Sequence, residues 1–159
     1  SVVAGRSGTD FRQGYLSTAP DRTVRVRQAG DRAWLTIKGR SVGATRAEWE
    51  YQIPPDEAAE LLGLAETPVL EKTRYLVDYA GRTWEVDVFR GSNAGLVIAE
   101  IELEAEDAVV EPPPWLGAEV TGDRRFYSSS LARHPMPDGR PDLVPVMFAV
   151  DEPVASAGA

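Results

Sequence analysis

The feature that most constrains this chain is a run of alternating residue types between Gly95 and Glu106. Every second residue from Leu96 onward lies on one side of the run, and this side includes Ile98 and the three glutamates Glu100, Glu102 and Glu104. The intervening residues are Val97, Ala99, Ile101 and Leu103. Because successive side chains of a β-strand point to opposite faces, the run predicts a strand with an acidic face and an apolar face. On an ordinary half-buried strand, the acidic face would simply be solvated.

Five other segments alternate in a similar way, with charge on one face and apolar residues on the other. They are residues 23–27, 34–38, 46–53, 70–79 and 83–89. The basic side chains on the charged faces are Arg25, Arg27, Lys38, Arg46, Lys72 and Arg74. The acidic side chains, including two from the first run, are Glu48, Glu50, Glu85, Asp87, Glu100 and Glu102. Residues 11–16 are expected to form a further strand.

Two arrangements explain these charged faces. One is a solvated sheet with ion pairs between neighbouring strands. The other, which accounts for six strands together, is a sheet that closes around a polar lumen. Charges inside a dry lumen would be costly to bury, but a bound polyanion and metal ions would offset that cost. Arginine and lysine bind phosphate oxygens, and carboxylates two residues apart on one strand can share a divalent cation.

Composition excludes several kinds of protein. The 159 residues suffice for one domain with a substantial core, and a formal net charge of −8 argues against a nucleic-acid-binding protein. Cysteine is absent, so a metal site would use carboxylates, which suits Mg²⁺ or Mn²⁺. No apolar run approaches the roughly 18 residues of a membrane span, and the start lacks a signal-peptide pattern. We therefore expect a cytoplasmic protein without a membrane partner.

Outside the alternating segments, the sequence predicts two helices and a C-terminal extension. A helix is expected from Pro54 to Gly63, with prolines and acids in its first turn, and a short one between Asp123 and Ala132. Residues 143–150 are apolar enough for a last strand or a plug, whereas residues 151–159 are expected to be disordered. We predict one domain over residues 1–135 and a partly disordered extension over residues 136–159.

Taken in order, the charged segments resemble those of CYTH-domain proteins, also called triphosphate tunnel metalloenzymes. The resemblance extends roughly from Gln13 to Leu131. Its segments are Arg25-Val26-Arg27, Thr36-Ile37-Lys38, Glu48-Trp49-Glu50, Lys72-Thr73-Arg74-Tyr75, Trp84 to Phe89, Glu100 to Leu103, Trp115-Leu116-Gly117 and Glu119-Val120-Thr121. The resemblance implies a mainly β (α+β) fold, a closed antiparallel eight-stranded tunnel barrel with flanking helices. It also implies hydrolysis of triphosphates with Mg²⁺ or Mn²⁺, and a short chain like this one is most similar to inorganic tripolyphosphatases.

Within that resemblance, the charged residues take three expected roles. The substrate-binding residues are Arg25, Arg27, Lys38, Arg46, Lys72 and Arg74. The metal ligands are Glu100 and Glu102. The remaining acids, Glu48, Glu50, Glu85 and Asp87, are grouped as catalytic; they would orient the bases, bind a second ion or position water, and the sequence does not apportion these roles. The expected partner is tripolyphosphate, or a nucleoside or thiamine triphosphate, and the oligomeric state is left open, with a homodimer as one possibility.

The chain departs from the family at its start. The family begins with a Glu-x-Glu-x-Lys strand whose carboxylates bind metal, and the residues before Gln13 contain neither glutamate nor lysine. Either the reading frame extends upstream of Ser1, which we expect, or the protein lacks one metal-binding strand. The second case leaves an alternative function, a polyphosphate- or nucleotide-binding module impaired in catalysis. Thiamine triphosphatases and adenylyl cyclases are other relatives to which the chain could belong.

Three other groups of polar residues are not expected to act in chemistry. His134 has no evident partner and is interpreted as a surface residue. Ser128, Ser129 and Ser130 lack the Gly-x-Ser-x-Gly pattern of a nucleophile and fit the surface of a helix. Residues 91–93 are interpreted as a turn and not as a phosphate-binding loop.

Overall fold

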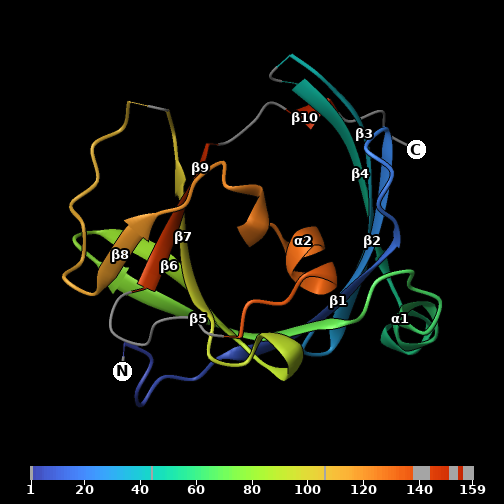
Figure 1. The fold of residues 1–159 in the computed structure, drawn as a ribbon, viewed down its shortest axis with the longest axis horizontal. Helices are drawn as coiled ribbons and strands as arrows, with labels where there is room; N and C mark the ends of the chain where they lie inside the picture. The colour runs from blue at the N-terminus through green and yellow to red at the C-terminus, as the bar shows by residue number, and fades with distance from the viewer. Residues whose placement is uncertain (1, 44, 106, 138–143, 151–153, 156–159) are drawn as a thin grey trace. The chain divides into compact units, whose positions relative to one another are not determined.

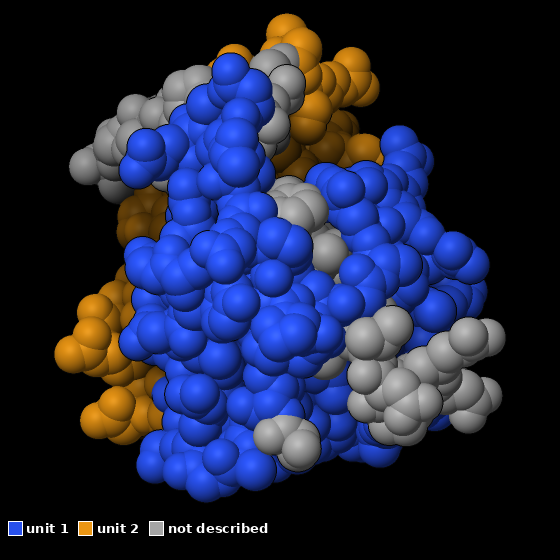
Figure 2. Space-filling view, turned by 90° about the vertical axis from the view of Figure 1, so that its left-hand side faces the viewer, with its two compact units in different colours: residues 1–10, 72–151 blue, residues 11–71, 152–159 orange. Residues whose placement is uncertain are grey.

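The computed structural model describes residues 2–43, 45–105, 107–137, 144–150 and 154–155. The chain divides into two compact units, each built from two stretches of sequence. Unit 1 contains residues 1–10 and 72–151, and unit 2 contains residues 11–71 and 152–159; Figure 2 shows them in separate colours. Each unit has its own apolar cluster.

The sheet of unit 2 consists of four long strands and one short one. The long strands are β1 (Thr9–Ser17), β2 (Arg22–Ala29), β3 (Arg32–Val42) and β4 (Thr45–Ile53), and consecutive strands pair antiparallel. The short strand β10 (Val154–Ala155) runs parallel to β4, which gives the order β10-β4-β3-β2-β1. Short connections between consecutive strands explain why the sequence neighbours are also spatial neighbours.

Helix α1 (Pro55–Leu62) covers the apolar face of this sheet (Figure 1). Proline occupies its first turn together with Asp56 and Glu57, whose charges suit the positive end of the helix dipole. Ala58 and Leu62, four residues apart, are buried against Val26 and Ala33. The predicted helix and its end at Gly63, which is the C-cap, are confirmed.

The sheet of unit 1 contains antiparallel and parallel pairs. Strands β5 (Leu70–Tyr79), β6 (Arg82–Phe89) and β7 (Val97–Leu103) pair antiparallel in order. Strand β9 (Val144–Val150) runs parallel both to β7 and to β8 (Leu116–Glu119), giving the order β5-β6-β7-β9-β8. The short helices are η1 (Gly91–Asn93), η2 (Arg124–Phe126) and α2 (Ser128–Arg133).

The β5–β6 hairpin shows how local sequence sets register. Tyr79 pairs with Arg82, so Ala80 and Gly81 form a two-residue loop, and both have positive φ angles of 50° and 75°. Hairpin loops of this length favour left-handed residues because their twist matches the twist of the strands. The register that follows places Arg74 opposite Asp87 and Leu76 opposite Glu85.

The apolar face of this sheet is the core of unit 1. Trp84 and Val86 are fully buried in a cluster with Val77, Ala99, Ile101 and Leu103. Trp115 packs edge-on against Trp84 with 5.8 Å between ring centroids. The sequence predicted this apolar face, and the residues packed on it include Val2, Val3 and residues from the segment 108–116.

The mainly β fold with helices and the antiparallel pairing within β1–β4 and within β5–β7 are confirmed, but the prediction of a closed antiparallel eight-stranded barrel is wrong. The pairs β7–β9, β8–β9 and β4–β10 are parallel. After β7 the chain crosses back to the starting end of the sheet before each last strand, so these strands run in the same direction as their neighbours. Among the described residues, neither unit's sheet closes on itself into a barrel. Residues 144–150 form the predicted last strand, whereas residue 143 and most of residues 151–159, for which disorder was expected, lie outside the described part of the chain.

Candidate active site

A buried ion cluster lies on the polar face of β5 and β6 in unit 1. The Nζ atom of Lys72 lies 2.7 Å from Oδ2 of Asp87. Arg74 donates from Nε to Oδ1 of Asp87 at 2.7 Å and from Nη2 to Oδ2 at 2.9 Å. The side chains of Lys72, Asp87 and Arg74 are only 6%, 7% and 16% exposed. One carboxylate therefore holds two buried cations in fixed positions, and we call these three residues the Asp87 cluster.

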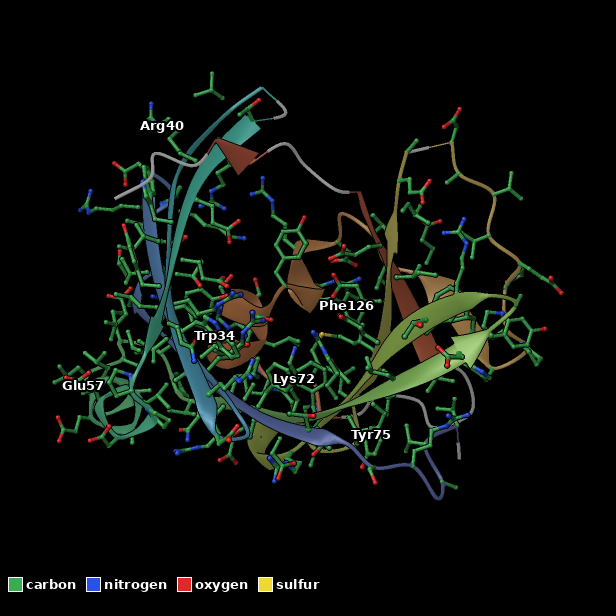
Figure 3. The ribbon with its side chains drawn as sticks, turned by 180° about the vertical axis from the view of Figure 1, so that it is seen from behind. Trp34, Arg40, Glu57, Lys72, Tyr75 and Phe126 are labelled. Atoms are coloured by element: carbon green, nitrogen blue, oxygen red, sulfur yellow. The ribbon has the colours of Figure 1, made fainter. Side chains whose placement is uncertain are left out.

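Electrostatics within the Asp87 cluster favour the charged forms of Asp87 and Arg74. Burial alone would raise the pKa of Asp87, but the hydrogen bonds from Arg74 and the charges of Lys72 and Arg74 hold that pKa below its usual range. Burial alone would lower the pKa of Arg74, but its hydrogen bond and attraction to Asp87 and the charge of Glu85 raise that pKa above its usual value. Figure 3 shows Lys72 and Tyr75 on opposite sides of β5, as the strand alternation requires.

Carboxylates from β6 and β7 lie beside this cluster. Glu85 forms an ion pair with Arg74, with 2.9 Å between Oε2 and Nη1, and it stands opposite Glu100 in the β6–β7 register. Burial raises the pKa of Glu100, and the negative charges of Glu85 and Asp87 raise it further, although Arg74 partly opposes this. A pocket of about 410 Å³ opens here. It is lined by Leu76, Arg82, Thr83, Glu85, Glu100, Ile101 and Glu102.

This pocket has the right donors for a divalent cation. Carboxylate oxygens are the ligands that Mg²⁺ and Mn²⁺ prefer, and the raised pKa of Glu100 shows that its negative charge lacks full compensation from the protein. A cation beside Glu100 and Glu102 would supply that compensation. Among the described residues, however, no group of three or more acids or histidines is already arranged as a metal cage. The residues therefore fit an ion that also takes oxygens from its substrate and from water.

The polar face of unit 2 is defined by the register of β1 to β4. One row across the sheet contains Gln13, Arg27, Trp34 and Gln52. The next row contains Tyr15, Arg25, Thr36 and Glu50, and a third pairs Thr23 with Lys38 and Lys38 with Glu48. The predicted residues of this unit thus share one face. Figure 3 shows Trp34 on the side of these strands away from Glu57 of α1.

Several side chains on this polar face are held by neighbours. Thr36 donates from Oγ1 to Oε2 of Glu50 at 3.1 Å. Arg46 donates from Nε to the carbonyl of Gly39 at 2.7 Å, and its Nη2 lies 3.4 Å from Oγ1 of Thr23. The guanidinium group of Arg27 lies over the ring of Phe11, 5.7 Å from its centroid. Arg46 is therefore bound to backbone at the edge of the face, whereas Arg25 and Arg27 occupy its middle rows.

The predicted charged residues share a face within each unit, and the uncharged Gln13, which the sequence did not single out, lies on the face of unit 2. Its side chain is 1% exposed, and it lies directly opposite Arg27. Alternation along β1 places Gln13 with Tyr15 on the polar face, and this was the available signal. Gln13 carries no charge, so the charge pattern of the strands does not point to it.

Residues that were not expected to act in chemistry lie outside the β-strands. His134 is exposed after α2, as predicted. Residues 91–93 form the turn η1, where Asn93 donates from Nδ2 to the carbonyl of Leu131 at 3.0 Å and accepts from the backbone N–H of Met136 at 2.8 Å. The buried Asn93 thus ties this turn to α2, which is a structural role.

Residues 5–129 match the CYTH domain family. The chain belongs to the CYTH family. It is similar to an inorganic triphosphatase of Acetivibrio thermocellus, with 53% identity over 129 residues that cover 80% of this chain and 83% of the relative. It is also similar to an inorganic triphosphatase of Nitrosomonas europaea, with 41% identity over 128 residues, 77% of this chain and 83% of the relative.

A solved structure agrees with this assignment. The crystal structure of an inorganic triphosphatase aligns with a TM-score of 0.65 and 36% identity, covering 82% of this CYTH chain and 89% of that one. No helix in the described part of the chain is both long and apolar enough to cross a membrane.

Proposed function

We propose that this CYTH protein is a triphosphatase that hydrolyses inorganic tripolyphosphate to pyrophosphate and phosphate. The observation that carries the proposal is the 53% identity, over 80% of the chain, to a relative named inorganic triphosphatase. The geometry supports it, because each unit gathers basic and acidic side chains on one face of its sheet. A polyanion such as tripolyphosphate suits these faces, because arginine and lysine bind phosphate oxygens.

In this proposal the cations bind the phosphate oxygens. Arg25, Arg27, Lys38 and Arg46 do so from the sheet of unit 2, and Lys72 and Arg74 from the sheet of unit 1. Catalysis of phosphoryl transfer depends mainly on positioning the phosphates and on stabilising the charge of the transition state. Cations held in fixed positions therefore stabilise that charge more than mobile cations do. Asp87 and Glu85 fix Arg74 through the bonds described above, and Asp87 also fixes Lys72. We assign both acids to positioning the cations, and we assign Glu50 to fixing Thr36 and Glu48 to fixing Lys38.

A divalent metal ion belongs to the proposal. CYTH triphosphatases are generally metal-dependent, and we propose Mg²⁺ or Mn²⁺ at Glu100 and Glu102. When bound, the ion would offset negative charge on the triphosphate during phosphoryl transfer. The protein's own part is to present these two carboxylates together from one strand face. A cytoplasmic location, expected from the sequence, stays a prediction.

A phosphate-release assay tests the proposed function. Wild-type protein is incubated with tripolyphosphate, pyrophosphate or ATP in Mg²⁺, in Mn²⁺ and in excess chelator. We expect release from tripolyphosphate only with metal, and faster release than from ATP. Tight binding of tripolyphosphate without release would instead indicate a phosphate-binding module. Because Trp34 lies on the polar face of unit 2 and offers a ring to a nucleobase, the ATP comparison is repeated with Trp34→Ala.

A further inference from the structure

Gln13 of β1 is buried without a hydrogen-bond partner. Only 1% of the residue's surface is exposed, and among the described residues neither its Nε2 nor its Oε1 has a partner. Burying an amide costs free energy unless its donors and acceptor are paired. Replacing such an amide with an apolar group of the same shape is often neutral or stabilising. The stability of unit 2 therefore does not explain why this position holds glutamine.

The surroundings of Gln13 are polar. In the β1–β2 register it stands opposite Arg27, and Arg25 lies two residues along the same face of β2. The Nε of Arg25 is buried as well and has no hydrogen-bond partner among the described side chains. The apolar core of this unit, with Val26 and Leu62, is on the other face of the sheet. Gln13 and Arg25 thus present unused N–H donors on one face.

Unused buried donors beside guanidinium groups indicate an oxygen-rich anion as the ligand. Each non-bridging oxygen of a phosphate accepts several hydrogen bonds, and arginine alone donates in a fixed fork. A neutral amide adds a donor without adding charge, so it can hold an oxygen that the two guanidinium forks leave unbound. Its orientation is limited because the side chain is enclosed.

We propose that Gln13 is a substrate-contacting residue whose Nε2 donates a hydrogen bond to a non-bridging oxygen of the phosphate chain held by Arg25 and Arg27. This inference rests on the proposed function, because it takes tripolyphosphate as the ligand of this face. It adds a neutral side chain to a set of contacts otherwise made by charged residues.

The test compares Gln13→Met, which keeps the volume and removes the amide, with Gln13→Glu, which keeps the shape and removes the donor. Gln28→Met is the matched control, because Gln28 lies on the opposite face of neighbouring β2, paired with Arg12 and Ala33. Binding of tripolyphosphate is measured by calorimetry in excess chelator, and KM and kcat are measured with Mg²⁺. Thermal melting is recorded for every variant.

We expect Gln13→Met to raise both Kd and KM for tripolyphosphate roughly tenfold or more, as for loss of a hydrogen bond to a charged group. Its kcat and melting temperature should stay near the wild-type values, and Gln13→Glu should raise Kd further. Wild-type Kd and KM in both variants, or a lowered melting temperature with unchanged Kd, would overturn the inference and make Gln13 structural.

A measurement on the wild-type protein covers variants that fail to fold. The side-chain amide signal of Gln13 in an ¹⁵N-labelled sample should shift when tripolyphosphate is added in chelator, and no shift at saturation would overturn the contact. If wild-type protein neither binds nor hydrolyses tripolyphosphate, the proposed function fails and this inference fails with it. If wild-type protein does both and the Gln13 variants behave as it does, only this inference fails.

Discussion

Asp87→Asn is the substitution whose effect follows most directly from the structure. It keeps the shape of the side chain and removes the one negative charge that pairs with both Lys72 and Arg74. All three side chains are nearly buried, so water cannot replace the lost carboxylate well. Arg74 keeps its second ion pair with Glu85 at 2.9 Å, which limits the damage on one side.

The expected loss lies at the lower end of the range for breaking a buried ion pair, about 3 kcal/mol in the free energy of unfolding. For a chain of this length, that corresponds to a fall in melting temperature of about 6–12 °C. Asp21→Asn is the control, since Asp21 pairs with Arg22 at the surface, where both side chains are well exposed. We expect that control to lose less than about 1 kcal/mol.

Urea unfolding and thermal melting in metal-free buffer measure both variants. A second change, Lys72→Met in the Asp87→Asn background, should recover part of the loss because it removes an uncompensated buried cation. Tripolyphosphate should also stabilise Asp87→Asn more than wild type, since its oxygens can replace the missing carboxylate. If Asp87→Asn is as stable as Asp21→Asn, the cluster is not desolvated and our reasoning about it is wrong.

Three further predictions concern the same charged faces. Because the pKa of Asp87 is depressed, its contribution to stability is complete above the ordinary aspartate pKa of about 3.9 and is lost as the pH falls through the folded-state value. The difference in the free energy of unfolding between wild type and Asp87→Asn should therefore shrink in acid. A difference that does not depend on pH would contradict this prediction. Burial and neighbouring carboxylates raise the pKa of Glu100, so its ionised form costs stability at neutral pH, and that cost is relieved as the pH falls through the raised value. Glu100→Gln should therefore have a higher melting temperature than wild type at pH 7.5 in chelator, and it should lose metal-dependent phosphate release. A lower melting temperature would count against this prediction. Arg25→Met should raise KM for tripolyphosphate roughly tenfold or more through loss of a charge-assisted hydrogen bond, whereas Arg22→Met, at the exposed start of the same strand, should leave KM unchanged in the same steady-state assay.

The sequence alone determined which side chains share a face. In β2, β5, β6 and β7 the alternation placed Arg25 with Arg27, Lys72 with Arg74 and Glu85 with Asp87, and the structure has the same pairs on the same faces. This succeeds because side-chain direction in a strand depends only on the position in the pleat. The helix at Pro55–Leu62 was predictable for a similar reason, since its proline, acids and end signal are local.

Register and direction of the strands needed the tertiary structure. Alternation does not say that Asp87 stands opposite Arg74, because a shift by two residues would keep every face and change every pair. The parallel pairing of β9 with β7 and β8 depends on the path of the chain after Leu103 and leaves no mark in the periodicity of either strand. The Asp87 cluster is a product of that register.

Burial was the other quantity that only the folded chain could supply. The sequence gives Lys72 and Lys38 the same chemistry, yet packing around β5 leaves Lys72 almost without water and bound to Asp87. Gln13 looked like an ordinary polar residue of a strand, and only its enclosure opposite Arg27 made its unpaired amide visible. Residue type and period are local, whereas desolvation is set by atoms from distant parts of the chain, and desolvation determines how strongly a charge or an amide acts.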